Sequence, residues 1–541
     1  MKKTRVTFAD TQQFSSLIDK YLSGDPGLKP FYNFLPEISS FKEIIEERQK
    51  VALNRKLLAA SLISQYGSIL ENTDEATQKV QASIRSLEDA NTFTVTTGHQ
   101  LNIFTGPLFS IYKIATTIKL ATELRALFPQ YNFIPVFWMA SEDHDLEEIN
   151  HTRIFGKEVK WDKVAGGAVG RMNTDGMQEV LDRVKEITGT PGNGVEVFDE
   201  AYTGSATLAE ATRKIIHALF AEYGLVVIDG DDKNLKSEFI NEMRDEIILQ
   251  KTFDAVKKTT ADLSKLHKTL VQPREINLFY LASGSRERIV RDDNNRYRVL
   301  NSDKIFTESE IVTELNSHPE NFSPNVILRT MYQEKILPNL AYIAGPGELS
   351  YWLQFKDAFE ASGIPFPVVL LRNCFLLLDK SSALKFEKLG IPITDLFQTT
   401  DNLIDKVLEN SSDTNINTNG ITEVVQSAFH DLGKHLGSLD PSLVASAEAE
   451  KQKALKGIAA LEEKAHRALK RKNETLVTQV KNLKEKLFPG GGLQERTENF
   501  LPYYNRNGQN FIRDIIEQSD PFEKQFIVLQ EEAEIAETKN R

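Results

Sequence analysis

The chain has very little cysteine: Cys374 is the only one among its 541 residues. A single cysteine cannot form a disulfide within the chain, and it excludes zinc sites built from several thiolates. Cys374 lies inside the apolar run 368–378, so we interpret it as a small buried hydrophobic residue rather than a nucleophile. This cysteine usage favours a reducing, cytoplasmic location.

The sequence also lacks long apolar runs and an excess of positive charge. The basic N-terminus has no apolar run behind it, as a secretory signal would, and no stretch approaches membrane-spanning length. The net charge of −12 provides no overall basic field to attract nucleic acid or anionic lipid. We therefore predict no nucleic-acid partner and no membrane association.

The composition is that of a globular protein, with 40% hydrophobic and 26% charged residues. A chain of this length is expected to form about two to four structural units.

Three apolar segments are typical of strands in a parallel sheet covered by helices. They span residues 92–96, 133–139 and 224–229, and a helical pattern over about 107–127 separates the first two. We predict an α/β fold in which residues 91–380 form a core with a doubly wound parallel sheet. Insertions are indicated at about 156–205 and 277–335; the second begins with a few antiparallel strands and contains a helix capping box at 307–310.

Helical patterns flank this core. Residues 1–90 are predicted to form a helical layer packed on it. Residues 381–489 are long charged helices with leucines at multiples of seven, which favours an antiparallel coiled-coil arm with an exposed turn at 410–420. Residues 490–541 are apolar enough to return to the core.

The first candidate site motif, Thr97-Gly98-His99-Gln100, follows the first strand. Ligands of open α/β sheets bind at the carboxyl ends of the strands, and the helix near Pro107 would direct its positive end there. His99 could stabilise a phosphate or carboxylate, or it could only hydrogen-bond the loop. Lys113 could face the same pocket or be solvated.

The second motif, Ser141-Glu142-Asp143-His144-Asp145, follows the next strand. Such a cluster of ionisable groups could bind an ammonium, orient hydroxyls or supply a general base. A metal site that includes His151 is conceivable, although the spacing matches no familiar zinc pattern. The alternative is an acidic helix start, because carboxylates suit a first turn.

Two further segments could bind anions. The loop Gly345-Pro346-Gly347-Glu348 could form an anion-binding turn or a structural turn capped by its glutamate. Arg329 suits a bidentate grip on a carboxylate or phosphate, or it could anchor a helix terminus.

Together these residues resemble the bacillithiol biosynthesis cysteine-adding enzyme family, BshC. The resemblance covers essentially the whole chain, and it rests on the segments 97–100, 105–108, 112–113, 135–138, 142–145, 150–151, 323–325 with Arg329, and 345–348.

The resemblance implies a Rossmann-like core related to class I aminoacyl-tRNA synthetases and nucleotidylyltransferases, and a C-terminal coiled coil that pairs subunits into a homodimer. It implies a ligase that forms an amide bond between cysteine and the amine of glucosaminyl malate, with ATP or another nucleotide as cosubstrate. The implied residues that bind this cofactor are Thr97, Gly98, Gln100, Thr105, Gly106, Arg329, Gly345 and Gly347.

The implied catalytic residues are Asp143, His144 and Asp145, which would hold or deprotonate the amine, together with His99 and Lys113, which would offset phosphate charge. No metal site is assigned. Two other classes stay open: an adenylating enzyme that acts on another small molecule, and a scaffold whose arm recruits pathway enzymes.

Overall fold

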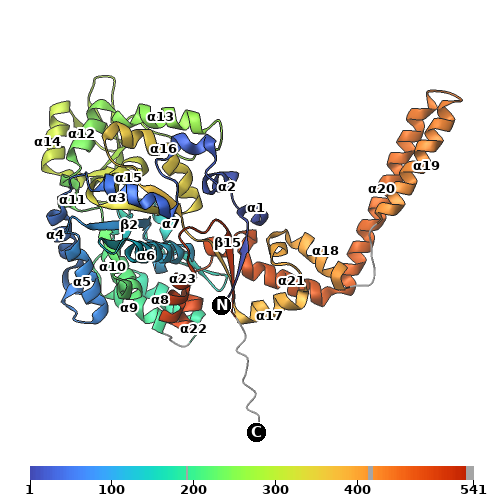
Figure 1. Cartoon of the computed structure of the whole chain (residues 1–541), viewed down its shortest axis with the longest axis horizontal. Coiled ribbons are helices and arrows are strands. Elements are labelled where there is room, and N and C mark those ends of the chain that lie inside the picture. The colour runs from blue at the N-terminus through green and yellow to red at the C-terminus, as the bar shows by residue number, and fades with distance from the viewer. Residues whose placement is uncertain (190–192, 412–417, 532–541) are drawn as a thin grey trace, which may run out of the picture.

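The computed structural model describes residues 1–189, 193–411 and 418–531. Figure 1 shows a large α/β body and a helical arm that extends away from it.

A five-stranded parallel sheet forms the centre of the body. Its strand order is β13 (Val368–Leu371), β12 (Asn339–Ala344), β2 (Thr92–His99), β3 (Asn132–Met139) and β6 (Val226–Asp229). The three strands expected from sequence are confirmed here as β2, β3 and β6. All five are largely buried, as their apolar sequences require.

The connections of this sheet run in opposite directions from its middle. The chain passes from β2 through α6 (Phe109–Leu127) to β3 on one side, and from β12 through α16 (Pro346–Ser362) to β13 on the other. Because such crossovers are right-handed, the two helices cover opposite faces, as Figure 1 shows. The sheet is therefore doubly wound, as predicted, and β2 and β12 flank the point where the direction reverses.

The first expected insertion lies in the long connection from β3 to β6. This connection contains α7 (Leu146–Ile149), the hairpin β4 (His151–Ile154) and β5 (Lys157–Lys160), α8 (Met177–Thr188), α9 (Asn193–Thr203) and α10 (Leu208–Phe220).

The second expected insertion lies between β6 and β12 and carries an antiparallel sheet. The helices α11 (Lys233–Ser237), α12 (Ile240–Leu249) and α13 (Lys251–Leu263) lead to β7 (Leu278–Ala282), β8 (Ser285–Arg291), β9 (Tyr297–Val299) and β10 (Ile305–Phe306). They are followed by α14 (Glu308–Ser317), β11 (Phe322–Pro324) and α15 (Val326–Ile336), with the sheet order β10-β9-β8-β7-β11. The predicted antiparallel strands and the capping box of Thr307 and Glu310 are confirmed.

The N-terminal layer departs from expectation at its start. It contains α1 (Phe8–Thr11), α2 (Ser16–Leu22), α3 (Phe41–Arg48), α4 (Arg55–Tyr66) and α5 (Glu75–Ser86), but residues Lys2–Val6 form a strand, β1. This strand pairs with β15 (Phe526–Gln530), which also pairs with β14 (Phe375–Leu378). A wholly helical layer was wrong here because the strand depends on a partner more than 500 residues away, which no local pattern reveals.

The C-terminal segment returns to the body up to residue 531, and the rest of the predicted range, 532–541, lies outside the described residues. After the arm come α22 (Leu501–Asn507) and α23 (Gln509–Gln518); the latter packs against α6, and β15 then completes the three-stranded sheet.

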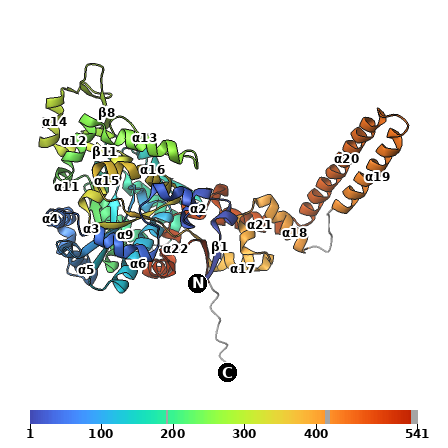
Figure 2. The ribbon, with the colours of Figure 1, turned by 45° about the horizontal axis from the view of Figure 1, so that its top comes forward.

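The arm consists of α17 (Lys380–Leu389), α18 (Thr400–Ser411), α19 (Asn419–Gly437), α20 (Leu443–Lys472) and α21 (Glu474–Leu487). The helices α19 and α20 pack together as a hairpin beyond α18 and α21 (Figures 1 and 2), which gives the expected antiparallel arrangement. The expected turn at 410–420 falls largely on residues 412–417, outside the described residues. No helix in the described ranges is long and apolar enough to cross a membrane.

Candidate active site

A cavity of about 1100 Å³ opens at the carboxyl ends of the parallel strands. It is bounded by the residues that follow β2, β3 and β12, by the antiparallel insertion, and by α2 of the N-terminal layer. The crevice where the winding direction reverses is the usual ligand position in such sheets. Both sequence motifs therefore lie at the expected edge, and two polar clusters line the cavity wall.

The first cluster, which we call the Glu348 cluster, lies where β2 and β12 meet. The carboxylate of Glu348 forms an ion pair with Lys113 at 2.5 Å. It also accepts hydrogen bonds from Tyr342 at 2.9 Å, from Tyr351 at 3.2 Å and from the backbone N–H of Gly345 at 2.7 Å. Glu348 thus caps α16, and the capped turn considered from sequence is present in the wall of the cavity.

Burial and ion pairing oppose each other in this cluster. Burial lowers the pKa of Lys113, whose side chain is 2% exposed, and the attraction of Glu348 only partly compensates. Burial would raise the pKa of Glu348, but Lys113 and the hydrogen bonds outweigh it and hold this pKa below its ordinary value. Lys113 also donates to the carbonyl of Gly98, so it is a buried, fully engaged lysine and not a solvated one.

Arg329 adds a second positive charge beside this cluster. Its guanidinium lies 6.0 Å from the ring centre of Tyr342, and it lines the cavity together with Gly345 and Gly347. The only carboxylate in the cluster is already paired with Lys113. The β2–β12 side of the cavity therefore carries positive charge in excess of its carboxylate.

His99 lines the cavity but carries no charge. Burial, together with the nearby Lys113 and Arg372, lowers the pKa of His99 to about 3, so the imidazole is neutral near pH 7. The role of offsetting phosphate charge therefore stays a prediction for His99, since the site without ligand presents a neutral imidazole. Its Nε2 is buried without a hydrogen-bond partner among the described residues, so a neutral hydrogen bond to a ligand remains open to it.

Three predicted cofactor-binding residues lie outside the cavity wall. Thr97 is buried and donates its hydroxyl to the carbonyl of Ile343. Thr105 and Gly106 belong to a loop with positive φ values of 63° and 68°, and Asn499 donates to the carbonyl of Gly106 at 2.7 Å. This loop is fastened to the C-terminal segment instead of facing the cavity.

The second cluster, which we call the Asp143 cluster, lies at the end of β3. Gln100 donates to Asp143 at 2.9 Å and also contacts Glu148. The backbone N–H of His144 donates to the other Asp143 oxygen at 2.8 Å. Of the three residues predicted to handle the amine, Asp143 alone is in the cavity wall.

Asp143 is an anion. Burial opposes its ionisation, but the hydrogen bonds from His144 and Gln100 and the charge of Arg286 together place its pKa well below its ordinary value. Arg286 approaches from β8 of the antiparallel sheet, with its Nη1 3.9 Å from the Asp143 carboxylate.

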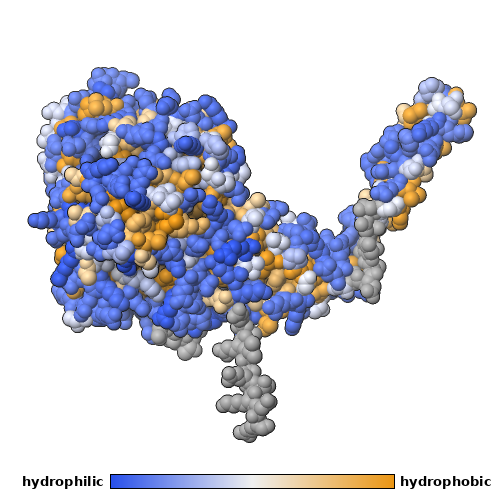
Figure 3. All heavy atoms as spheres, in the orientation of Figure 1, coloured by the Kyte–Doolittle hydropathy of each residue, from blue (hydrophilic) through white to orange (hydrophobic). Residues whose placement is uncertain are grey.

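Figure 3 shows that the face of the body around its centre mixes hydrophobic and polar surface.

The two residues that follow Asp143, His144 and Asp145, do not line the cavity. His144 is about half exposed, and Arg286 donates to its Nδ1 at 3.2 Å. Asp145 is exposed and caps α7 by accepting from the N–H of Glu148, which is the acidic helix start considered from sequence. His151 contacts the carbonyl of Glu147 and the side chain of Asn150. No three metal-ligating side chains converge in the described parts of the chain.

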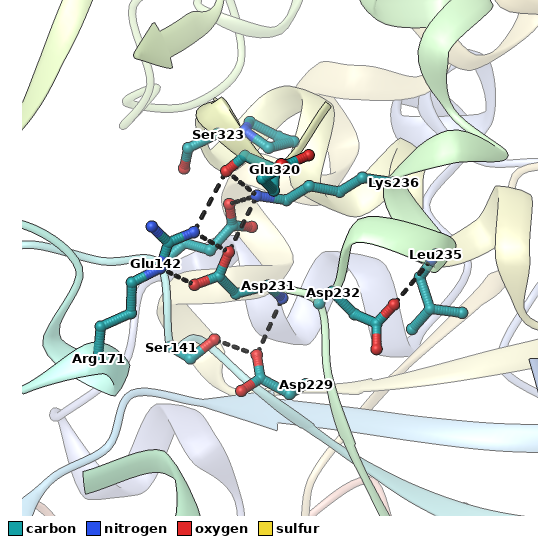
Figure 4. Close-up of polar contacts among 12 residues, drawn as sticks. Ser141, Glu142, Arg171, Asp229, Asp231, Asp232, Leu235, Lys236, Glu320 and Ser323 are labelled. Atoms are coloured by element: carbon teal, nitrogen blue, oxygen red, sulfur yellow. Dashed lines mark hydrogen bonds and ion pairs between the residues drawn. The ribbon is translucent and has the colours of Figure 1, made fainter. Parts of the chain in front are cut away.

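A further ionic network fastens the loop that carries Asp143 (Figure 4). Lys236, which is 1% exposed, lies 2.6 Å from Glu142 and 3.1 Å from Asp231. Arg171, from the first insertion, forms two hydrogen bonds with Asp231 at 2.6 and 2.7 Å. Burial would lower the pKa of Lys236, but its two carboxylate partners raise it overall, so this lysine is charged.

Two family models together match most of the chain. "Bacillithiol biosynthesis BshC, N-terminal Rossmann-like domain" matches residues 1–373, and "Bacillithiol biosynthesis BshC, C-terminal coiled-coil domain" matches residues 375–531. The chain belongs to the BshC family. The division between the two models falls just before β14, which pairs in the three-stranded sheet and not in the core sheet.

Similar proteins extend over nearly the whole length of this BshC chain. A relative from Flavobacterium johnsoniae is 39% identical over 97% of this chain and 99% of its own length. One from Cytophaga hutchinsonii is 38% identical over 96% and 97%, and one from Christiangramia forsetii is 40% identical over 97% and 98%. All three carry the name "Putative cysteine ligase BshC".

Sequence reasoning missed two arginines of this BshC site. Arg286 lies in an alternating polar strand with no motif around it, and only the antiparallel sheet brings it to Asp143. Arg372 follows β13 and pairs with Glu495 at 2.7 Å, with both side chains at most 2% exposed. The end of β13, next to β12, was the available signal for Arg372, since ligands gather at strand ends.

Cys374 is buried and burial raises its pKa far above the ordinary value, despite the nearby Arg372. A thiol that stays protonated is a poor nucleophile, so the interpretation of Cys374 as a small buried side chain agrees with its surroundings.

Proposed function

We propose that the protein is the cysteine ligase of bacillithiol biosynthesis, which joins the carboxyl group of cysteine to the amine of glucosaminyl malate. The observation that carries this proposal is the similarity, over 97% of the chain, to a relative named as a cysteine ligase. The large cavity at the reversal point of a Rossmann-like sheet supports it, because two small molecules and a nucleotide need such a volume.

Amide formation requires an activated carboxylate, and ATP or another nucleotide is the proposed activating cosubstrate. In the adenylate route, a cysteine carboxylate oxygen attacks the α-phosphorus and pyrophosphate leaves; the amine then attacks the acyl carbon and AMP leaves. The phosphates and carboxylates would bind on the β2–β12 side, where Arg329 and Lys113 supply positive charge and His99 a neutral hydrogen bond.

The amine of glucosaminyl malate would bind at Asp143. An ammonium cannot attack an acyl carbon, so the amine must lose a proton; a carboxylate would hold and orient it while the proton leaves. Asp143 is ionised and lies in the cavity wall, whereas Asp145 caps a helix.

The arm is proposed to pair two copies of the chain as a homodimer. Several large hydrophobic side chains are exposed on α19 and α20, among them Ile421, Val424 and Leu461, at 61%, 69% and 66%. Figure 3 shows hydrophobic surface along the arm, away from the body. Exposed apolar side chains on a helix pair favour burial against another helix surface.

The proposed location is the cytoplasm.

Mass spectrometry of the products tests the reaction. Purified protein is incubated with cysteine and glucosaminyl malate, with and without ATP, and with each substrate omitted in turn. The expected product is the cysteinyl amide, formed only when both substrates and the nucleotide are present. Pyrophosphate release without any amide would point instead to an adenylating enzyme with another acceptor, and no amide with any nucleotide would refute the proposal.

A further inference from the structure

Arg286 reaches the site from a different sheet. It lies on β8 of the antiparallel insertion, while Asp143 and His144 follow β3 of the core sheet. Its side chain is 8% exposed. A buried guanidinium needs acceptors for its N–H groups, and the hydrogen bonds of Arg286 show which acceptors it has.

Contacts to its own insertion fix the position of the guanidinium. Its Nε donates to the hydroxyl of Ser323 at 3.0 Å, and its Nη2 donates to the carbonyl of Pro324 at 2.9 Å. Its Cζ lies 4.0 Å from the ring centre of Phe279. These three contacts leave Nη1 to point at the end of β3.

Nη1 meets both polar residues there. It lies 3.2 Å from Nδ1 of His144 and 3.9 Å from the Asp143 carboxylate. A guanidinium only donates, so Nδ1 must accept, and the imidazole proton is on Nε2. The competing contact, between His144 Nδ1 and Asp143, is longer at 3.5 Å.

We propose that Arg286 is a positioning residue that occupies Nδ1 of His144 and holds Asp143 as the anion that receives the substrate ammonium. Without Arg286, Nδ1 of His144 would be free to turn to Asp143 and occupy the carboxylate oxygen that the amine needs. The cavity lining agrees, because Asp143 lines the cavity and His144 does not. This inference rests on the proposed function, since it assigns the substrate amine to Asp143.

A double-mutant cycle on kcat/KM separates this role from a merely structural one. Arg286→Gln is expected to lower kcat/KM for the amine substrate by about 30-fold in the otherwise unchanged chain. In an Asp143→Asn background the same change should cost about 3-fold or less, because the group through which Arg286 acts is already neutral. An equal loss in both backgrounds would overturn the proposal.

Two companion variants complete the cycle. Arg286→Lys keeps the charge but loses the planar fork, so it should recover part of the loss, mostly through KM. Arg298, exposed on β9 of the same sheet, is the matched control, and Arg298→Gln should leave kcat/KM unchanged. Thermal unfolding of each variant identifies any that fail to fold; for such a variant, the lysine replacement supplies the decision.

A crystal structure of the Arg286→Gln variant provides a readout that does not depend on the reaction. The distance between His144 Nδ1 and Asp143, now 3.5 Å, should close to about 2.8 Å. Unchanged side-chain positions would contradict the proposal. If the unmodified protein forms no amide, the proposed function fails, and this structure still decides whether Arg286 keeps the two residues apart.

Discussion

The Glu348 cluster and the Asp143 cluster lie along the same edge of one sheet, yet they are built differently. In the first, the lysine and the carboxylate both belong to helices of the core, α6 and α16, and the pair is mostly buried. In the second, the carboxylate follows a core strand but its cation comes from a separate antiparallel sheet. The first cluster is fixed by the core fold; the second depends on how the insertion docks.

This difference has a chemical consequence. In the Glu348 cluster the carboxylate is saturated by Lys113, two tyrosines and a backbone N–H, so it holds the cavity wall together. Asp143 has a distant cation and about a third of its side chain exposed, so it can take another partner. The Glu348 cluster is thus suited to structure and to the proposed anion binding, and Asp143 to the proposed amine binding.

The largest expected effect tests the structural role of the Glu348 cluster. Lys113→Met leaves the buried carboxylate without its cation and should lower the free energy of unfolding by about 3 kcal/mol. Urea denaturation measures this loss. The double variant Lys113→Met with Glu348→Gln removes both charges and should regain a substantial part of it. If Lys113→Met were as stable as the parent protein, the Glu348 cluster would not have the structural role assigned to it.

The next effect concerns catalysis at the Asp143 cluster. Asp143→Asn should lower kcat by about 100-fold, because the neutral side chain no longer holds and orients the amine for attack. The matched control is Asp145→Asn, since Asp145 only caps α7, and its activity should stay within about 3-fold of the parent. Steady-state kinetics with varied glucosaminyl malate measures kcat for both variants. Equal losses of kcat would contradict the assignment of the amine to Asp143 rather than Asp145.

A smaller effect is expected in the pH dependence of stability. The pKa of Asp143 is lower in the folded protein than in the unfolded chain, so its ionised form stabilises the fold above about pH 4. This contribution, about 1 kcal/mol because the side chain is partly exposed, is lost as the pH falls through the lower folded value. Unfolding measured from pH 7 down to about pH 2 should show a constant stability gap to Asp143→Asn above about pH 4 and a shrinking gap below it. A gap that stays constant below about pH 4 would contradict the shift.

The smallest effect on activity is expected in the arm. The double substitution Ile421→Glu with Val424→Glu places charges on exposed apolar positions of α19 and should convert the proposed dimer to a monomer. Because the arm extends away from the body (Figure 2) and no described residue of α19 or α20 lines the cavity, kcat should change by less than about 2-fold. Light scattering reports the mass. Gln426→Glu, on the same helix, is the control, and a monomeric parent would refute the dimer.

The sequence predicted what local pattern encodes. Apolar strands such as 133–139 and the capping box at Thr307 depend on neighbours in the chain, and both were found where expected. Contacts between distant segments were not predictable: β1 needs β15, and Arg286 needs the docking of a whole sheet. The neutral state of His99 was also hidden, because it follows from burial and from two cations that only the fold brings near. The expected relation of the core to class I synthetases stays a prediction.

The most direct test of the account is a crystal structure with glucosaminyl malate bound. The account predicts that the amine nitrogen lies about 3 Å from an Asp143 oxygen, with the malate carboxylates on the β2–β12 side of the cavity beside Arg329. An amine bound at Glu348, or a substrate bound outside this cavity, would contradict it.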